Sequence, residues 1–592
     1  MNIDRLGLSP CFLRARFWHA ILHVNLLRKA PPAAYSGFVS TVLTSTVVPS
    51  APRFVHYSQD NDGAPSKLGD YFWYSLGMLG THHYKLKIYK GRYRTWLERA
   101  NDLDCLTLIW AVQALQSSHE KFARKFITYP KEAVTEKMIG EFAIYKWELE
   151  TIVTSLLTTP KDRPRLGKYR YTNLTQFSSL SSLVHYLRDI ENIEYAKTGT
   201  ADNIWEEMYR IGQRQFSWQR GYNCEQLYRY AYVYGQGECA EFFEEQNGLS
   251  VSIFLWLSLA LFALTMEKPW IIAPDVSILK MGQDNMEKTL ALHSIELTDA
   301  RSKAKALIDD AVTKLRAPLR TAYMPSLLRQ RSMLKNTGRV TTYCAPLPPL
   351  VMNRATAGLY YDIKQGPDRL LTEANTRFEE YIRKLVEAYH PRFAALKGEP
   401  YGSSKATEVD PPDCLVKDGE EITIAVECKA TKLTFEGQFA ENPTIAAKQG
   451  LEQLAKGIFQ LWRFFSHVRR GIYTTHTVSP TAHGIVLTMD SWMQMATKLR
   501  EGALERAKEL AAADPEIKDE DRRMVVFASV QELNDTFAQT ETDNFMTVLG
   551  HAVSEKYRGY GLPKLARECG VQLVRKGFPL NVAEILPWWE QI

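Results

Sequence analysis

The change of hydrophobic period near residue 360 constrains the fold more than any other feature of this 592-residue chain. From about 65 to 310, apolar residues recur every three or four positions, which predicts amphipathic helices. After 360, short apolar runs alternate with helical stretches. Strands that alternate with helices favour an α/β domain built on a mixed sheet. The sequence therefore predicts a multidomain protein with a mainly α-helical N-terminal region and a C-terminal α/β domain.

The expected helices and strands can be placed from their period and from the residues that flank them. In the C-terminal part we expect helices at 367–390, at 444–469 and near 491–512. Strands are expected there at 413–417, 421–430, 483–490 and 523–530. These short apolar runs, bounded by charged or turn residues, are typical of buried strands. In the N-terminal region, helices are expected at 104–126, 137–157 and 201–216.

A basic stretch separates the two parts of the chain. No acidic residue lies between Asp310 and Asp362, whereas eight basic residues do. The prolines of "CAPLPPL", 344–350, cannot continue a helix. We therefore predict four segments, namely a basic leader or extension (1–60), an α-helical region (61–343), a linker (344–366) and an α/β domain (367–592).

Two segments bear on targeting and on membrane association. Residues 1–30 are basic but lack the continuous apolar core of a secretory signal, so a role as a targeting segment stays open. Residues 249–266 carry no charge and approach the minimum length of a membrane span. Neither flank carries a cluster of positive charge, and serines interrupt the run. We therefore expect a helix buried in the helical region and no membrane association.

Composition limits the compartment and the cofactors. The eight cysteines are scattered, without a CxxC pair or a Cys/His spacing suited to zinc. This pattern favours a reducing cytoplasm and no structural metal. The net charge of +6 is small for the length, so affinity for nucleic acid must come from local clusters of basic residues. The sequence has no phosphate-binding GxxxxGK[ST] loop, so any ATP hydrolysis must come from a partner.

The strand expected at 421–430 carries Glu427 and Lys429 within its apolar run. Side chains alternate across a strand, so its two faces differ. One face is apolar and holds Ile422, Ile424, Val426 and Cys428. The other is small and polar and holds Thr423, Ala425, Glu427, Lys429 and Thr431. Because ionised groups in a core are costly unless they are paired or bind a metal, the alternatives are an ion pair, a partly solvated edge or a catalytic site.

Asp413 follows two prolines, and the register of the hairpin decides which face it joins. If the hairpin turns through a three-residue loop at 418–420, Asp413 lies opposite Ala425 and on the face of Glu427. A two-residue turn at 418–419 would send Asp413 to the other face. The shared face therefore requires the longer loop or a bulge.

A shared face for Asp413 and Glu427 would favour metal binding. Two carboxylates that converge on one pocket repel each other unless a cation joins them. A small number of hard oxygen ligands suits Mg²⁺ or Mn²⁺. Such an ion polarises a phosphoryl oxygen and lowers the pKa of bound water. Lys429 beside it would orient that water or stabilise the charge of the transition state.

The order of these motifs resembles the PD-(D/E)XK nuclease superfamily. A helix with an acidic residue precedes PPD (411–413), a hairpin leads to VECK (426–429), and a glutamine-bearing helix follows. The resemblance covers roughly 367–535. It implies that the C-terminal α/β domain has a restriction-endonuclease-like core with a central mixed sheet.

The resemblance also implies roles for individual residues. Asp413 and Glu427 would be metal ligands together with the backbone carbonyl of Cys428, and Lys429 would be the catalytic lysine. Asp410 is an alternative to Asp413, although it precedes both prolines.

Two flanking helices would complete the site. Glu379 would be the supporting acidic residue of the first helix, with Glu380 as the alternative. Gln453 and Gln460 would belong to the glutamine-bearing helix and contact nucleic acid. Phe464 stands where RecB-type exonucleases carry a tyrosine, so endonuclease and exonuclease activity both stay open.

The resemblance implies a metal-dependent nuclease that acts on DNA rather than RNA, such as an effector of prokaryotic defence against phage. The alternative is a nucleic-acid-binding or scaffold protein that keeps the fold without cleavage. A separate ATPase or sensor subunit and a homo-oligomer are compatible with either reading.

Two basic clusters outside this domain are candidates for contact with nucleic acid. The first is Arg329, Arg331 and Lys335, which have no acidic neighbour in the sequence and are predicted to hold the phosphate backbone. The alternative is that acidic residues elsewhere in the fold pair with them. The second is the segment 81–99, which interleaves basic with aromatic residues. A solvated hairpin without a binding role is the alternative for this segment.

Overall fold

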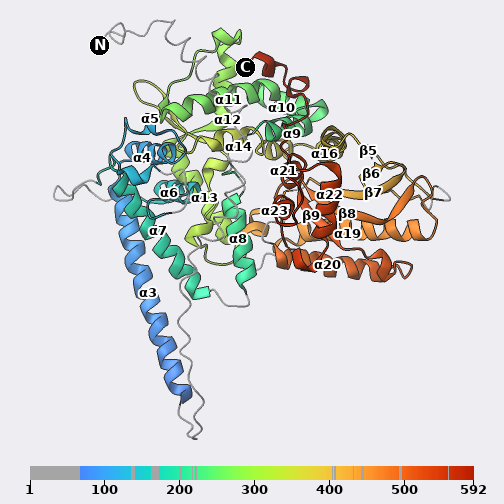
Figure 1. Ribbon diagram of the computed structural model, residues 1–592. Helices are drawn as coiled ribbons and strands as arrows, with labels where there is room; N and C mark the ends of the chain where they lie inside the picture. The colour runs from blue at the N-terminus through green and yellow to red at the C-terminus, as the bar shows by residue number, and fades with distance from the viewer. Residues whose placement is uncertain are drawn as a thin grey trace. The chain divides into compact units, whose positions relative to one another are not determined.

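The structure is a computed structural model that describes residues 67–134, 140–161, 172–198, 203–216, 218–219, 223–402, 405, 408–430, 432–441, 446–491, 496–557 and 559–591 (Figure 1). The predicted leader, 1–60, and the targeting segment within it lie outside the described residues. The chain forms two compact units. Of the described residues, the first contains those between 67 and 198 together with Leu257–Arg354, and the second contains those between 203 and 256 together with Ala355–Gln591.

This division differs from the predicted one in two ways. The boundary after Arg354 falls inside the predicted linker, but that segment is folded: Leu347, Leu350 and Val351 are fully buried. Its prolines lead into a short helix, α14 (Pro349–Ala355), because proline is tolerated in the first turn. In addition, Thr200–Trp256 belongs to the second unit.

The first unit is mainly helical, as the period predicts. Its longer helices are α3 (Lys67–Arg99), α4 (Asp102–Leu115), α6 (Lys146–Thr158), α7 (Phe177–Thr198), α12 (Gln283–His293) and α13 (Leu297–Leu315). It also holds a small mixed sheet that the sequence did not predict, in the order β1-β4-β3-β2. Its strands are β1 (Trp270–Ile271), β2 (Ser294–Glu296), β3 (Met333–Asn336) and β4 (Thr342–Cys344). Strands of two to four residues are too short to show an alternating pattern.

The uncharged segment 249–266 forms helix α11 (Val251–Glu267), and the prediction of a buried helix is confirmed. Leu255, Leu257 and Leu261 are completely inaccessible to solvent. Among the described residues, no single helix is long and apolar enough to cross a membrane. Helix α10 (Gly237–Asn247) and α11 pass that test only as a pair, bent by 66°.

The second unit is an α/β domain with a five-stranded mixed sheet. The strands are β5 (Phe393–Leu396), β6 (Cys414–Asp418), β7 (Glu421–Lys429), β8 (Thr477–Thr488) and β9 (Val525–Ser529), in that spatial order. β5, β6 and β7 are antiparallel neighbours, whereas β7, β8 and β9 run parallel. All four predicted strands are confirmed, and β5 at the edge is an addition.

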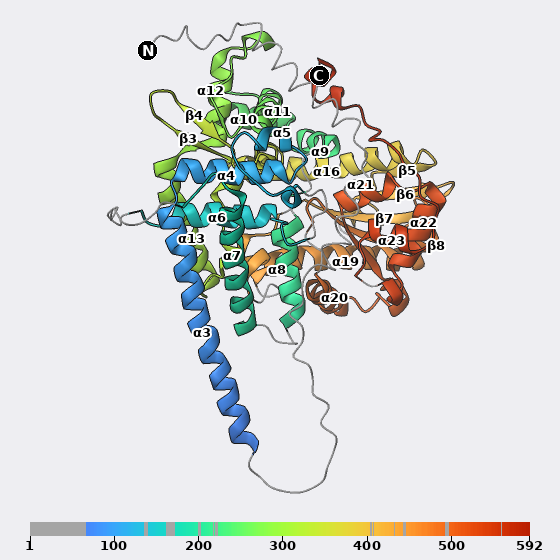
Figure 2. The same cartoon turned by 60° about the vertical axis from the view of Figure 1, so that its left-hand side comes forward.

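The second unit also contains helices (Figures 1 and 2). They include α8 (Ile204–Phe216), α9 (Cys224–Tyr234), α15 (Leu359–Ile363), α16 (Asp368–Tyr389), α19 (Lys448–Arg469), α20 (Thr497–Ala512), α21 (Val530–Phe537), α22 (Thr542–Ala552) and α23 (Leu562–Glu568). Of these helices, α16, α19 and α21 contact the five-stranded sheet. The core between α19 and the sheet includes Leu454, Ile458 and Leu461 on the helix, and Ala425 and Val486 on the strands. This packing places one face of α19 against β7, where Glu427 and Lys429 lie.

Candidate active site

Glu427 and Lys429 lie at the carboxyl end of β7 and form an ion pair. The Lys429 Nζ atom is 3.0 Å from Glu427 Oε2. The Glu427 side chain is 1% exposed and that of Lys429 is 14% exposed, so the pair is almost fully removed from water. The carboxylate and the amine therefore lie on one face of the strand, as the alternation predicts.

The β6–β7 hairpin brings Asp413 to the same place, but not through the predicted loop. Asp418 pairs with Glu421, so the turn holds only Gly419 and Glu420. Gly419 has φ = 64°, a conformation that glycine adopts without strain. A register shift between Val416 and Lys417 then changes the pairing. Cys414 consequently pairs with Val426, and the expectation that Asp413 lies opposite Ala425 is wrong by two residues.

Without the bulge, the two-residue turn would place Asp413 opposite Val426 and therefore on the other face of the hairpin. The bulge shifts the register by one residue and returns Asp413 to the face of Glu427. The Asp413 Oδ2 atom accepts a hydrogen bond from the backbone N–H of Cys428 at 2.7 Å. Cys428 therefore fixes Asp413 through its amide. On the other side, the Arg383 guanidinium on α16 donates to the Asp413 backbone carbonyl at 2.9 Å. Asp413 is thus held by both a strand and a helix.

Burial and crowding perturb the acidic groups of the site. Burial raises the pKa of Glu427 to about 8, with Lys429 opposing the shift and Asp413 adding to it. Burial and the Asp413 carboxylate raise the pKa of Glu379 to about 7. Burial also raises the pKa of Asp413, against the effect of Lys429. Burial disfavours the charged form of Lys429, but Glu427 and Asp413 hold the pKa of Lys429 above its ordinary value.

The alternatives to Asp413 and Glu379 lie elsewhere. Glu379 on α16 interacts electrostatically with Asp413 and Lys429. Glu380, its neighbour, instead faces α9, where it accepts a hydrogen bond from the Tyr232 hydroxyl at 3.5 Å. The structure therefore brings Asp413, Glu427 and Lys429 together in one cluster, with Glu379 in electrostatic interaction with them, and turns Glu380 toward α9. Asp410 is exposed to solvent but also acts electrostatically on Asp413.

Helix α19 covers this cluster with one face. With its amide nitrogen turned to the strand, Gln460 donates to Glu427 Oε2 at 3.2 Å. Gln453 lies seven residues earlier, about two turns away on the same side of the helix. Gly457 lies between them, and a Cβ atom there would come within 3.0 Å of the Lys429 Cε atom.

Gly457 and Arg383 are not among the site residues predicted from the sequence. A glycine inside a helix lowers helix stability, so "LAKGIF" carried a detectable sign of close packing. Arg383 shows no such sign, because its partner is a backbone carbonyl that only the fold brings near.

A second, partly buried ion pair lies just beyond the ends of β7 and β8. Lys432 Nζ is 3.0 Å from Asp490 Oδ2, and the Tyr230 hydroxyl donates to Asp490 Oδ1 at 2.6 Å. The ammonium also lies over the rings of Tyr360 and Tyr361, at 5.6 and 5.7 Å from their centroids. Burial disfavours the charge of Lys432, but Asp490 and the tyrosines hold its pKa above the ordinary value. This pair ties the segment after Lys429 to its neighbours.

The cluster provides some of the features that a divalent cation requires. The Glu427 Oε1 atom is buried and has no hydrogen-bond partner among the described residues. The perturbed carboxyl groups would be stabilised as anions by a cation. In the described part of the chain, however, no three Cys, His, Asp or Glu side chains form a ready-made metal cage. Asp413 and Glu427 therefore fit as two ligands of an ion that is otherwise held by backbone, water or substrate oxygens.

The basic cluster at 329–335 does not have the free charges that the sequence predicts. Arg329 forms two hydrogen bonds with the buried Glu150 carboxylate, at 2.8 and 3.0 Å. Arg331 donates to the carbonyls of Ala291 and Leu292. Lys335 pairs with Glu296 at 3.3 Å.

The alternative, in which acidic residues elsewhere in the fold pair with this cluster, is therefore the one observed for Arg329 and Lys335, and contact with nucleic acid stays a prediction. Acidic residues far away in the sequence are brought close by the fold of the first unit and compensate Arg329 and Lys335. Their side chains hold that unit together.

Comparisons of the chain with protein-family models, with curated proteins and with solved structures find no match.

Proposed function

We propose that the protein is a metal-dependent nuclease whose active site is the cluster of Asp413, Glu427, Lys429 and Glu379. The observation that carries this proposal is the buried Glu427–Lys429 pair, with Asp413 held beside it by the Cys428 amide. The desolvation of a buried ion pair can cost more free energy than the attraction between its charges returns, so such a pair is weak evidence of a stabilising role. Carboxyl groups with perturbed pKa values are concentrated at functional sites. The motif order resembles the PD-(D/E)XK superfamily, so we also propose a restriction-endonuclease-like core for the second unit.

Each residue has a role that follows from its surroundings. Asp413 and Glu427 would hold Mg²⁺ or Mn²⁺, and the Cys428 backbone would help to fix them. The ion would neutralise the carboxylates and polarise a phosphoryl oxygen of the substrate. Lys429 carries a positive charge and would stabilise the negative charge that develops on the phosphoryl group. Glu379, whose pKa lies near neutrality, would accept or donate a proton at the edge of the site.

Helix α19 would orient this machinery. Gln460 donates to Glu427 and therefore limits the rotation of its carboxylate. Gln453, on the same side of α19, would contact the substrate. DNA is the proposed substrate, and a role in prokaryotic defence against phage is the proposed setting by analogy with the superfamily.

The proposal is tested by incubating the purified full chain with supercoiled plasmid, linear duplex DNA and RNA. Each reaction is run with Mg²⁺, with Mn²⁺ and with EDTA. We expect cleavage of DNA that requires the metal ion. Binding of DNA without cleavage under all metal conditions would instead favour the alternative of a non-cleaving nucleic-acid-binding protein.

A further inference from the structure

The solvent side of helix α3 forms a basic surface in the first unit. Between His82 and Arg99 the helix carries six basic residues and a single acidic one, Glu98. All six basic residues are exposed, namely Lys85, Lys87, Lys90, Arg92, Arg94 and Arg99. The alternative expectation for this segment, a solvated hairpin, is wrong, because the segment lies in a continuous helix.

The opposite side of α3 packs against α7, which lies beside it in both views (Figures 1 and 2). Tyr93 and Leu97 are buried, with exposed fractions of 6% and 1%. Tyr89 contacts Tyr186 of α7, with ring centroids 6.5 Å apart. Of the four aromatic residues between 84 and 96, only Tyr84 is exposed. The aromatic side chains thus mostly serve packing, and the basic ones face water.

The basic residues form two rows along the helix. Lys85, Arg92 and Arg99 are seven residues apart, about two helical turns, and therefore lie in one row. Lys87 and Arg94 form the second row with the same spacing. Tyr84 and Gly91 lie between the rows. A Cβ atom at Gly91 would meet nothing within 4 Å, so the middle of this surface is open.

Three of these charges are available for a partner. Among the described residues, Lys85, Lys87 and Arg92 form no ion pair, whereas Arg94 pairs with Glu98 at 2.8 Å. Lys90 pairs with Glu194 of α7 at 2.6 Å but is still 49% exposed. The surface therefore has an uncompensated positive charge.

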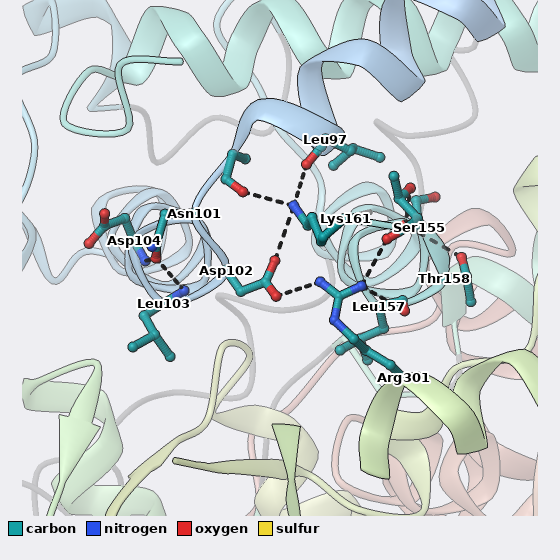
Figure 3. Close-up of polar contacts among 12 residues, drawn as sticks. Leu97, Asn101, Asp102, Leu103, Asp104, Ser155, Leu157, Thr158, Lys161 and Arg301 are labelled. Carbon is teal, nitrogen blue, oxygen red and sulfur yellow. Dashed lines mark hydrogen bonds and ion pairs between the residues drawn. The ribbon is translucent and has the colours of Figure 1, made fainter. Parts of the chain in front are cut away.

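The end of α3 is fixed by a polar network (Figure 3). The Lys161 ammonium donates to the backbone carbonyls of Leu97 and Ala100, with a distance of 2.8 Å to the second. It also pairs with Asp102 at 3.2 Å. The Leu97 carbonyl also accepts from the Ala100 backbone N–H at 3.3 Å, so Lys161 adds a second donor at this end of the helix, where intrahelical donors run out.

The same network connects α3 to α6. Arg301 of α13 pairs with Asp102 and donates to the carbonyl of Leu157 at 3.3 Å (Figure 3). It also donates to the carbonyl of Thr159 at 2.8 Å. Thr159 directly follows α6. The basic surface is therefore presented by a helix whose end is anchored to two others.

We propose that this basic surface of α3, centred on Lys85, Lys87 and Arg92, binds the phosphate backbone of a double-stranded nucleic acid. Two rows of cations on either side of an open centre match a polyanion with two charged strands. A single strand would require stacking platforms, and most of the aromatic residues face inward. The choice of nucleic acid over another polyanion rests on the proposed function.

The test measures binding to a short fluorescently labelled DNA duplex by anisotropy at several salt concentrations. All proteins carry Glu427→Gln and are kept in EDTA, so that cleavage does not interfere. The variant is Lys85→Ala/Lys87→Ala/Arg92→Ala. The matched control is Lys303→Ala/Lys305→Ala/Lys314→Ala, which removes the same charge from exposed positions of α13 in the same unit.

We expect the α3 variant to lower the slope of log affinity against log salt by about two to three, since each lost phosphate contact removes about 0.9. The α13 control should keep the slope of the parent protein. An unchanged slope in the α3 variant would overturn the inference. The inference would also be overturned if the α3 variant retained duplex binding but no longer bound phosphatidylserine vesicles that the parent protein binds, because the surface would then bind a membrane.

The central position allows a second, independent variant. Gly91→Glu places a negative charge between the two rows and should abolish duplex binding, whereas Gly91→Ala should retain it and remain folded. Equal binding by both variants would contradict the inference. Plasmid cleavage by the wild-type protein, which retains Glu427, is measured separately and distinguishes the two proposals. If the wild type cleaves DNA while the α3 variant binds the duplex normally, the inference about α3 fails and the proposed function remains.

Discussion

Gly457 on α19 lies so close to Lys429 on β7 that a methyl group at position 457 would come within 3.0 Å of the lysine Cε atom. A contact of this length is tighter than nine in ten contacts of real Cβ atoms, so the Lys429 side chain would have to move by a few tenths of an ångström. The absence of a side chain at 457 thus allows the helix to pack directly on the Glu427–Lys429 pair. The position of the lysine depends on this glycine.

We therefore predict that Gly457→Ala lowers DNA cleavage by about tenfold or more, because a displacement of a catalytic group by less than 1 Å can have effects of this size. The thermal midpoint should fall only modestly. The control is Gly550→Ala in α22, where a Cβ atom would meet nothing within 4 Å. Wild-type cleavage by a folded Gly457→Ala protein would show that Lys429 is not held in this way.

Two adjacent glutamates on α16 provide a matched pair. Glu379 belongs to the cluster, and Glu380 contacts Tyr232 instead. We expect Glu379→Gln to lower the cleavage rate by about 10²-fold or more, as for loss of an acid–base group, and Glu380→Gln to retain it. Rates are measured on supercoiled plasmid at saturating Mg²⁺. The reverse order of effects would mean that Glu380 is the supporting residue.

Arg329 is predicted to act on stability. Its partner Glu150 is only 6% exposed, so Arg329→Ala would remove a charged partner from a buried carboxylate and cost about 3 kcal/mol of unfolding free energy. Lys335→Ala breaks a more exposed pair with Glu296 and should cost less than about 1 kcal/mol. Urea unfolding of the two variants provides the comparison. Equal stability of both would contradict the structural role of Arg329.

His293 predicts a pH dependence of stability. The imidazole is fully buried between the hydroxyls of Ser258 and Ser332, each 2.8 Å from a ring nitrogen. Burial, and then Arg354 and Arg331, hold the pKa of His293 well below its ordinary value. In the unfolded chain the imidazole binds a proton at about pH 6.5, so the unfolded state gains protons first on acidification.

The contribution of His293 to stability is therefore present above about pH 6.5 and is lost as the pH falls below it, at about 1.4 kcal/mol per pH unit. We expect the thermal unfolding midpoint of the wild type to decrease as the pH is lowered from 7 to 5.5. The same fall should be smaller in His293→Gln, which does not titrate. Parallel pH profiles for the two proteins would show that His293 does not contribute.

The local elements of the second unit could be predicted from the sequence, but their register could not. The alternation in β7 placed Glu427 and Lys429 on one face, and the structure agrees. The bulge near Val416 carries no signal in residue type, so the position of Asp413 opposite β7 was predicted incorrectly. Asp413 still lies on the face of Glu427, because the shorter turn and the bulge each shift the register by one residue.

Long-range partners were the other part that the sequence could not supply. The pairing of Arg329 with Glu150 joins residues that are 179 positions apart, and no local pattern predicts such a contact. Thr200–Trp256 likewise belongs to the second unit because of contacts with residues that are distant in the sequence. Helical period shows that α9 has a buried face, but Tyr228 finds its partner Tyr381 only in the folded unit.

The most direct test of the central claim compares plasmid cleavage by the wild type with that by Glu427→Gln, Asp413→Asn and Lys429→Ala. Asp410→Asn, in an exposed position nearby, serves as the control. We predict that the wild type and the control cut DNA with Mg²⁺ and that EDTA stops them. Each of the three site variants should be folded and at least about 10²-fold slower. Cleavage at the wild-type rate by a folded Lys429→Ala protein, or no cleavage by the wild type with any divalent ion, would contradict the account.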